Sequence, residues 1–314
     1  MKAAIIDEYG SPEVIKIAEL PMPVPKQGEV LIKVFAASVN PVDWKIRRGN
    51  LKMLLNKKFP KILGIEFSGV IEELGENVTE FNKGQRVFAG RGYEGGGYAE
   101  YAIAEVGRTI AIPENISFEE ASTMAVAGMT ALQGLRNKGK IKPGADVIVN
   151  GASGGVGTYA VQIAKVLGAK VTAVCSAKNF DLLKDLGADV IIDYKETDFT
   201  KLPKKYNIVF DAVGYRTFWQ TRKVLKKRGI YVNISPSIPL YITSFFTRLN
   251  PGKKSKGFML HPDMKDLEEV MQMISEKKIK VVIDKIFPLE KLSEAHQYSE
   301  SERAKGKIVI SMNQ

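Results

Sequence analysis

Near the middle of the chain the sequence reads Val147-Ile148-Val149-Asn150-Gly151-Ala152-Ser153-Gly154-Gly155-Val156-Gly157. The three β-branched residues predict a buried strand, and the glycines after them predict a tight turn. A helix is then expected from Thr158 to Leu167, closed by Gly168. Such a turn lets the backbone approach an anion closely, and the free N–H groups at the helix start favour a phosphate. The segment therefore predicts a dinucleotide-binding site, the alternative being a purely structural turn.

The residues around this turn alternate between strand and helix patterns. From Asp146 to Ile234, short Val/Ile-rich strands are separated by helical stretches. Further strands are expected at 171–174, 190–192, 208–210 and 231–234, and a short helix at 180–186. Continuous apolar strands between helices indicate a parallel sheet covered on both faces, and hence an α/β fold.

The end of the second strand indicates which dinucleotide is bound. The turn fits the pattern G-x-G-x-x-G with Ala152 in the first glycine's place. Proteins that bind NAD carry an acidic residue about 20 residues further on. Here the sequence is Cys175-Ser176-Ala177-Lys178-Asn179, which offers a hydroxyl, a cation and an amide to a 2′-phosphate. We therefore predict NADPH. Tyr194, just past the third strand, is a candidate for the same phosphate or an ordinary strand-end tyrosine.

The two ends of the chain have a different pattern. Short apolar stretches at 30–34 and 67–71, separated by Gly and Pro, predict a compact β-barrel-like domain. Strands are also expected at 281–283 and 307–310, and we expect them to return to this first domain. With 314 residues, two domains are the natural expectation.

Composition restricts the function further. The chain has one cysteine, Cys175, and two histidines, His261 and His296, so a metal centre built from these residue types is close to excluded. The net charge of +11 favours anionic partners, but the basic residues are scattered, so no nucleic acid partner is expected. Neither a signal-peptide pattern nor a membrane-spanning apolar run is found, which predicts a cytoplasmic protein.

Further motifs occur in order along nearly the whole chain: Ala36-Ala37-Ser38-Val39-Asn40-Pro41-Val42-Asp43, Gly64-Ile65-Glu66-Phe67-Ser68-Gly69, Gly84-Gln85-Arg86-Val87, Gly96-Gly97-Tyr98-Ala99-Glu100-Tyr101, Gly128-Met129-Thr130-Ala131, Leu186-Gly187-Ala188-Asp189, Asp211-Ala212-Val213-Gly214 and Gly306-Lys307-Ile308-Val309. Together with the glycine turn, they resemble the medium-chain dehydrogenase/reductase superfamily, specifically its zinc-independent quinone oxidoreductase (zeta-crystallin-like) branch. The resemblance implies a GroES-like β-rich catalytic domain at 1–118, completed by 260–314. It also implies a Rossmann domain with a doubly wound parallel sheet at 119–259, with the nicotinamide meeting substrate in a cleft between the domains.

The resemblance also implies roles for individual residues. Asn40 would be the catalytic residue, lining the nicotinamide and substrate pocket, and Trp44, which follows it closely, is a candidate for the same pocket. Thr130 would contact the nicotinamide end of the cofactor, and Val213 belongs to a turn that lines it. The remaining cofactor-binding residues would be Ala152, Ser153, Gly154, Gly155, Val156 and Gly157 at the pyrophosphate, Ser176, Lys178 and Tyr194 at the 2′-phosphate, and Lys307 completing the site. Relatives often have a lysine at the position of Asn179, so the individual 2′-phosphate ligand stays open. A homodimer is the family's usual state.

Departures from the zinc-dependent branch indicate the substrate. Val42-Asp43 stands where zinc enzymes have a cysteine ligand, and Ile65 stands where they have a histidine. Without a Lewis acid the enzyme has no obvious way to ionise an alcohol. A quinone or an α,β-unsaturated carbonyl, whose conjugation spreads the arriving charge, is therefore the expected substrate. Glu66, without a metal neighbour, is expected to be structural.

Several alternatives stay open. A non-catalytic NADPH-binding protein, acting as a sensor, crystallin-like structural protein or nucleic-acid binder, would keep the same turn. His296, His261 and Cys175 are expected to have structural roles or none. The apolar segment 238–249, followed by Lys253, Lys254 and Lys256, is expected to shape a substrate pocket or a dimer contact, and less readily to touch a membrane surface.

Overall fold

The computed structural model describes residues 1–53, 55, 58–235, 237–249 and 251–312. The chain divides into two compact units. Unit 1 comprises Met1–Ala125 together with Ile283–Gln314, and unit 2 comprises Val126–Val282. The expected combination of a GroES-like β-rich domain and a Rossmann domain is confirmed.

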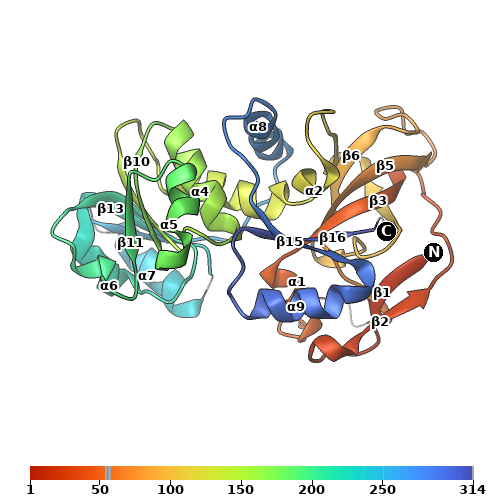
Figure 1. Ribbon diagram of the computed structural model, residues 1–314, viewed down its shortest axis with the longest axis horizontal. Coiled ribbons are helices and arrows are strands. Elements are labelled where there is room, and N and C mark those ends of the chain that lie inside the picture. The colour runs from red at the N-terminus through yellow and green to blue at the C-terminus, as the bar shows by residue number, and fades with distance from the viewer. Residues whose placement is uncertain (54, 56–57, 236, 250, 313–314) are drawn as a thin grey trace. The chain divides into compact units, whose positions relative to one another are not determined.

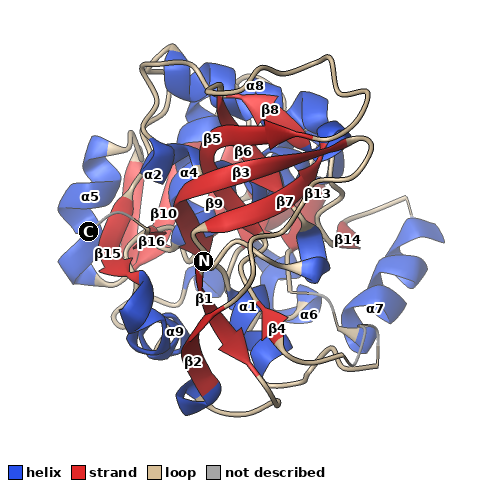
Figure 2. Cartoon of the chain, turned by 90° about the vertical axis from the view of Figure 1, so that its right-hand side faces the viewer, coloured by secondary structure: helices blue, strands red, loops and turns tan. Residues whose placement is uncertain are grey.

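Unit 1 is built on a mainly antiparallel sheet with a small second sheet beside it. Among the described residues the larger sheet has the order β15-β16-β3-β5-β6-β8, with β7 also paired to β3, and the smaller one has the order β2-β1-β4. Figure 2 shows β3, β5 and β7 side by side. The strands are β1 Lys2–Ile6, β2 Ile15–Glu19, β3 Glu29–Val39, β4 Lys61–Ile62, β5 Glu66–Leu74, β6 Arg86–Gly90, β7 Tyr101–Glu105, β8 Thr109–Ala111, β15 Ile283–Pro288 and β16 Lys307–Ser311.

Three helices accompany these sheets in the described part of unit 1: α1 Pro41–Arg47, α2 Phe118–Ala121 and α9 Leu292–Glu300. The chain end returns to the first domain, as expected, because β16 pairs antiparallel with β3 (Figure 1). The strand expected at 281–283 is displaced, however. The observed strand β15 begins at Ile283 and runs to Pro288, parallel to β16.

Unit 2 contains a parallel sheet with the order β11-β10-β9-β12-β13-β14. This is the doubly wound order, in which β9 and β12 are adjacent and the chain reverses direction across the sheet between them. Figure 1 follows the alternation of strand and helix from green to pale blue. The strands are β9 Asp146–Asn150, β10 Lys170–Cys175, β11 Val190–Asp193, β12 Tyr206–Asp211, β13 Leu225–Asn233 and β14 Lys254–Gly257.

Unit 2 has six α-helices among its described residues, and four of them, α4 to α7, pack against strands of this sheet. The six helices are α3 Thr130–Leu132, which is flanked by wide π-helical turns, α4 Gly155–Val166, α5 Phe180–Asp185, α6 Phe218–Thr221, α7 Ile238–Leu249 and α8 Met264–Ser275. Val147, Ile148 and Val149 of β9 are fully buried. A continuous apolar strand in the middle of a sheet with both faces covered explains why this segment carries no alternation of polar and apolar residues.

The boundaries between the units differ from the expected 118/119 and 259/260. Residues 119–125, expected in the Rossmann domain, belong to unit 1. They continue α2, whose first residue Phe118 stacks its ring on Phe35 at 4.7 Å and accepts the Ser68 hydroxyl with its carbonyl. The segment 260–282 belongs to unit 2 rather than to the catalytic domain. Gln133 Nε2 donates to Asp266 Oδ2 at 2.8 Å and to the His261 carbonyl at 2.7 Å, and apolar residues of α8 are buried. Polar side chains on α8 hid this packing in the sequence.

Candidate active site

The predicted phosphate turn has the expected geometry. β9 ends at Asn150, and α4 begins at Gly155, so the turn 151–154 lies between a buried strand and the first turn of a twelve-residue helix. Gly151 has a φ of +75°, which an L side chain rarely adopts. The N–H groups at the start of α4 have no partner within the helix and therefore suit an anion.

The glycines of the turn have different physical roles. A Cβ on Gly157 would lie 2.1 Å from the Gly151 carbonyl oxygen, so the protein's own packing excludes a side chain there. A Cβ on Gly154, in contrast, would meet only the Gly151 oxygen at 3.5 Å, and its φ of −84° suits any residue. The space over Gly154 is therefore open, as a bound pyrophosphate requires. The residues of the turn fit a dinucleotide.

The end of β10 brings the second predicted cluster to the same turn. Asn179 Nδ2 donates to Ser153 Oγ at 2.9 Å and to Ser176 Oγ at 3.3 Å, so the two serines lie close together. Lys178 is exposed, and Tyr194 is 56% exposed with its backbone N–H on the Cys175 carbonyl. The structure thus brings the pyrophosphate and 2′-phosphate candidates into one region, with Asn179 as an unexpected bridge.

A carboxylate that was not among the predicted site residues lies in this region. Asp193 ends β11, and its Oδ2 accepts the Ala177 N–H at 3.2 Å while its Oδ1 accepts the Lys195 N–H at 2.9 Å. Burial, together with the charge of Asp193, raises the pKa of Cys175 to about 11, so this thiol stays protonated at neutral pH. β11 pairs parallel with β10, which places Asp193 opposite Cys175. The sequence signal was available, because parallel neighbours end at the same edge of a sheet.

The turn containing Val213 is held by a buried polar network. Asp211 Oδ1 accepts the N–H groups of Val213 at 3.1 Å and Gly214 at 3.0 Å. Tyr231 donates to Asp211 Oδ2 at 2.8 Å, and burial raises the pKa of its hydroxyl. A Cβ on Gly151 would lie 2.6 Å from Val213 Cγ2, so this turn lies against the phosphate turn. Thr130 is buried at the start of α3, which packs on α4.

Asn40 lies in unit 1, between the end of β3 and α1, and its amide is held by three side chains. Its Oδ1 accepts from Lys307 Nζ at 2.6 Å, and its Nδ2 donates to Glu66 Oε1 at 2.8 Å and to Ser38 Oγ at 3.2 Å. Lys307 also lies 3.1 Å from Glu66 Oε1, and both residues are buried. Glu66 is the shared acceptor of this network, which agrees with the structural role expected for it.

Two further predicted site residues, Lys307 and Trp44, also lie in unit 1. Lys307 contacts Asn40 and Glu66 within unit 1, and its expected contact with the cofactor stays a prediction. Trp44 lies on α1, with Lys45 Nζ and Arg48 Cζ each 5.5 Å from its ring centroid. Its Nε1 is buried and has no hydrogen-bond partner among the described residues. Its place in the substrate pocket also stays a prediction.

A buried carboxyl group lies on the same helix. Asp43 Oδ2 accepts the Asn40 N–H at 2.8 Å, and its Oδ1 has no partner in the described part of the chain. Burial raises the pKa of Asp43 to about 7. The adjacent Tyr98, also fully buried, has a pKa well above its ordinary value because of burial and the charge of Asp43. In the sequence, Asp43 was noted only because it stands where zinc enzymes have a cysteine ligand.

His296 has a structural environment, as expected. It is fully buried on α9, and its Nδ1 accepts from Arg47 Nε at 3.3 Å. Burial and the neighbouring Arg47 charge lower the pKa of His296 to about 3. A histidine that stays neutral and enclosed is a poor proton donor for a substrate at neutral pH.

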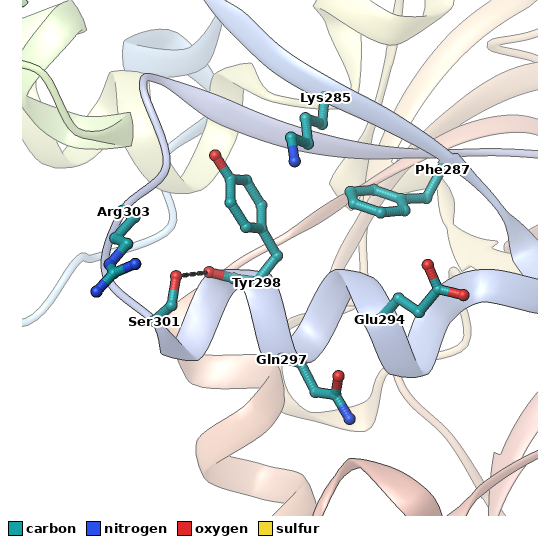
Figure 3. A pocket seen from close by; sticks show the side chains of 7 residues that line it. All are labelled: Lys285, Phe287, Glu294, Gln297, Tyr298, Ser301 and Arg303. Atoms are coloured by element: carbon teal, nitrogen blue, oxygen red, sulfur yellow. Dashed lines mark hydrogen bonds between the residues drawn. The ribbon is translucent and has the colours of Figure 1, made fainter.

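Other surface features add no second centre. Among the described residues, no group of three His, Cys, Asp or Glu side chains is placed to hold a metal ion, and no helix is long and apolar enough to cross a membrane. Figure 3 shows a shallow cavity between β15 and α9, where Lys285 Nζ lies 4.1 Å from the Tyr298 ring centroid. It contains none of the predicted site residues and is lined by Lys285, Phe287, Glu294, Gln297, Tyr298, Ser301 and Arg303.

Comparison with known proteins identifies the family of this chain. Residues 26–114 match the alcohol dehydrogenase GroES-like domain, and residues 186–310 match the zinc-binding dehydrogenase family. The chloroplastic quinone-oxidoreductase QR1 of Triphysaria versicolor is 37% identical over 99% of this chain and 98% of its own length. The chloroplastic NADPH-dependent alkenal/one oxidoreductase of Arabidopsis thaliana is 33% identical over 99% of this chain and 79% of its own length.

Solved structures of oxidoreductases also resemble this chain over its whole length. The quinone oxidoreductase from Coxiella burnetii superimposes with a TM-score of 0.92 at 33% identity, covering 100% of this chain and 99% of that one. The fold and its sites thus define an oxidoreductase of a class that binds a nicotinamide cofactor. Within this class the chain belongs to the zinc-independent quinone oxidoreductase branch of the medium-chain dehydrogenase/reductase superfamily.

Proposed function

We propose that this protein is an NADPH-dependent, zinc-independent oxidoreductase that transfers hydride to quinones or α,β-unsaturated carbonyls. The proposal rests first on the open space over Gly154 at the start of α4, next to the Ser153 hydroxyl. Bound there, NADPH would supply the hydride for the reaction. The residues of the chain would bind the cofactor, orient the substrate and stabilise the charge that develops on it.

The preference for NADPH is supported by the end of β10. Ser176 and the exposed Lys178 offer a hydroxyl and a cation to a 2′-phosphate. Asp193 is the carboxylate that opposes such binding, but both of its oxygens already accept backbone N–H groups. Hydrogen bonds to a carboxylate reduce its demand for other partners and disperse its charge. Lys178 then determines the preference for NADPH over NADH at this end of the site.

Asn40 is proposed to bind the carbonyl oxygen of the substrate. Of its two N–H donors, the one directed to Ser38 makes the longer bond, at 3.2 Å, and is the one that a substrate oxygen can share. The Lys307 ammonium on Asn40 Oδ1 polarises the amide and strengthens its N–H groups as donors. Glu66 accepts the other N–H and fixes which way the amide faces.

The substrate class is supported by the names of the relatives. It is also supported by the residues at the positions where zinc-dependent enzymes have their metal ligands. Relatives are named as a quinone oxidoreductase and an alkenal/one oxidoreductase. Ile65 replaces the histidine ligand of zinc enzymes. A conjugated electrophile accepts a hydride with little need for a Lewis acid, because conjugation delocalises the charge.

The direct test is NADPH oxidation followed at 340 nm with 9,10-phenanthrenequinone, 1,4-benzoquinone and an alkenal, with NADH as control. We expect electrophile-dependent oxidation of NADPH, much slower oxidation of NADH, and no requirement for added zinc. If NADPH binds but no electrophile is reduced, the protein is a non-catalytic NADPH-binding protein. If neither nucleotide binds, the proposed function is wrong.

We also propose that the protein forms a homodimer through α7. Ile238, Tyr241, Ile242, Phe245, Phe246 and Leu249 recur at helical spacing, and each is 45–77% exposed. Arg248 is the only charged residue of the helix, so two copies can meet with little charge repulsion. The outward N–H groups of the edge strand β14 are already bound, since Ser255 and Gly257 donate to the hydroxyls of Thr247 and Ser244. The helix face, and not the strand edge, is therefore the surface available to a second copy.

A further inference from the structure

Asn179 connects two segments of the proposed cofactor site. Its side chain is 5% exposed, and its Nδ2 donates to Ser153 Oγ at 2.9 Å and to Ser176 Oγ at 3.3 Å. Ser153 belongs to the turn before α4, and Ser176 follows the last residue of β10. The backbone N–H of Asn179 also donates to the Ser176 carbonyl at 2.9 Å. One buried amide thus holds two hydroxyl groups that come from separate strands of the sheet.

The direction of these hydrogen bonds decides what the serines can do. An amide NH₂ group has two hydrogens, and here both are donated to hydroxyl oxygens. Each serine therefore keeps its own hydrogen. In the described part of the chain no acceptor is found for either hydroxyl hydrogen. A hydroxyl that accepts a hydrogen bond becomes a better donor in turn. Both serines are thus prepared to donate to an anion.

The opposite orientation of the amide would remove this property. With Oδ1 directed at the serines, both hydroxyl hydrogens would be spent on Asn179, and two buried N–H donors would be left without partners. In the observed orientation the one polar atom of the Asn179 side chain that lacks a partner among the described residues is its buried Oδ1. An unpaired carbonyl oxygen is less costly than unpaired N–H groups. The local packing therefore favours the arrangement that leaves the serine hydrogens free.

We propose that Asn179 is a positioning residue for the cofactor, which directs the Ser153 hydroxyl hydrogen to the pyrophosphate and the Ser176 hydroxyl hydrogen to the 2′-phosphate. This inference rests on the proposed NADPH function. It assigns a role to the position at which the expected phosphate-binding lysine is absent, since Asn179 acts through its neighbours while Lys178 supplies the charge. If Asn179 has this role, replacing its hydrogen-bond donor by an acceptor should reduce NADPH affinity more than replacing it by an apolar group.

The test compares Asn179→Asp and Asn179→Leu, whose side chains have the same number and branching of heavy atoms as asparagine. A carboxylate would accept both serine hydrogens and turn the hydroxyl lone pairs toward the phosphates, whereas leucine leaves the hydroxyls free to rotate. We expect NADPH affinity to fall on the order of 10-fold in Asn179→Leu and 100-fold in Asn179→Asp. NADH lacks the 2′-phosphate and should lose about 10-fold less than NADPH in Asn179→Asp. Dissociation constants are measured by nicotinamide fluorescence at fixed ionic strength, and thermal unfolding of the cofactor-free variants checks their fold.

A Ser176→Ala background separates positioning from direct charge repulsion. If Asn179 acts through Ser176, the change in NADPH preference over NADH caused by Asn179→Asp disappears when Ser176 is alanine. Repulsion between the new carboxylate and the 2′-phosphate would persist in that background and would overturn the proposal. Should Asn179→Asp not fold, the same cycle with Asn179→Leu gives the answer. Wild-type protein that binds neither nucleotide refutes the proposed function. Wild-type binding of NADPH with equal losses of NADPH and NADH in the variants refutes only this inference.

Discussion

Asn40 could be recognised as a site residue from the sequence, but its hydrogen-bond partners could not be predicted. The motif around it indicated a site residue, and the structure adds that Lys307, from the other end of the chain, holds its Oδ1. The two residues are 267 positions apart, so no local pattern connects them. The same reason explains why the bond from Asn179 to Ser153 was not predicted: Ser153 follows a neighbouring strand, and the strand pairing had first to be known.

Removal of the Asn40 amide should affect turnover more than cofactor affinity. Asn40→Ala deletes the N–H proposed to bind the substrate oxygen, while none of its partners belongs to the phosphate turn. We expect kcat to fall on the order of 100-fold, with the Kd for NADPH changed less than about threefold. Steady-state kinetics and fluorescence titration measure the two quantities, and Asn50→Ala, at an exposed position, is the control. Equal losses in kcat and in NADPH affinity would count against this role.

Asp43 should make stability depend on pH. Its pKa is about 7 in the folded protein, above the ordinary 3.8, so the folded state holds a proton that the unfolded state has lost between these values. Stability from this group is complete below about pH 4 and is lost as the pH rises through 7. Asp43→Asn cannot ionise. Its unfolding free energy relative to wild type should therefore increase with pH, by up to about 4 kcal/mol between pH 4 and 8.

Urea unfolding of both proteins at several pH values between 4.5 and 8 tests this expectation. His296, whose lowered pKa makes stability fall as the pH drops below about 6.5, is present in both proteins, so its contribution cancels in the difference. Parallel pH profiles for wild type and Asp43→Asn would show that Asp43 is already ionised in the folded protein at low pH.

At the scale of elements, the phosphate turn was predictable because its requirements are local. A buried strand, a glycine turn and a helix follow one another within about twenty residues, and each has its own composition. The same holds for most strands of the parallel sheet. The strand β15 was less predictable because it is half exposed and its apolar residues do not form a continuous run. The assignment of α8 to unit 2 depends on contacts with residues far away in the sequence.

Alanine substitutions at two glycines of the turn should have different effects, one on the stability of the protein and the other on NADPH affinity. Gly157→Ala places a Cβ against the Gly151 carbonyl and should destabilise the cofactor-free protein by about 1–3 kcal/mol. Gly154→Ala meets no such contact and should leave the cofactor-free protein stable. Its methyl group would fill the space proposed for the pyrophosphate, so NADPH affinity should fall on the order of 10-fold or more.

Thermal unfolding without cofactor and titration with NADPH measure both effects in both variants. Each variant serves as the matched control for the other, since both add one methyl group to the same turn. Wild-type affinity in Gly154→Ala would mean that the nucleotide does not approach this residue. A stable Gly157→Ala would mean that the turn relaxes easily.

At the scale of the whole molecule, the presence of two domains could be predicted from the sequence, but the positions of their boundaries could not. Unit 1 is discontinuous, because β16 completes a sheet begun at the other end of the chain. The sequence indicated this return, since a strand at a chain end needs a sheet to join. The position of the boundaries follows from side-chain packing of α2 and α8, which polar and apolar patterns alone do not specify.

The exposed face of α7 should determine the oligomeric state. The double variant Phe245→Ser with Phe246→Ser removes two aromatic rings that are 61% and 65% exposed, so it should leave the fold intact and weaken a dimer. Sedimentation velocity at micromolar concentration should give a dimer for wild type and a monomer for the variant. Val24→Ser, exposed on unit 1, is the control and should stay dimeric. A monomeric wild type would leave the face to a membrane surface or another partner.

The most direct test of the central claim follows the hydride itself. NADPH carrying deuterium at the transferred C4 position is incubated with the chelator-treated protein and an alkenal, and the product is analysed by mass spectrometry and NMR. A zinc-independent hydride transfer predicts one deuterium per product molecule at the β-carbon, with equal yield in the presence and absence of chelator. A reduced product without deuterium, or reduction that stops on chelation and returns with zinc, would contradict it.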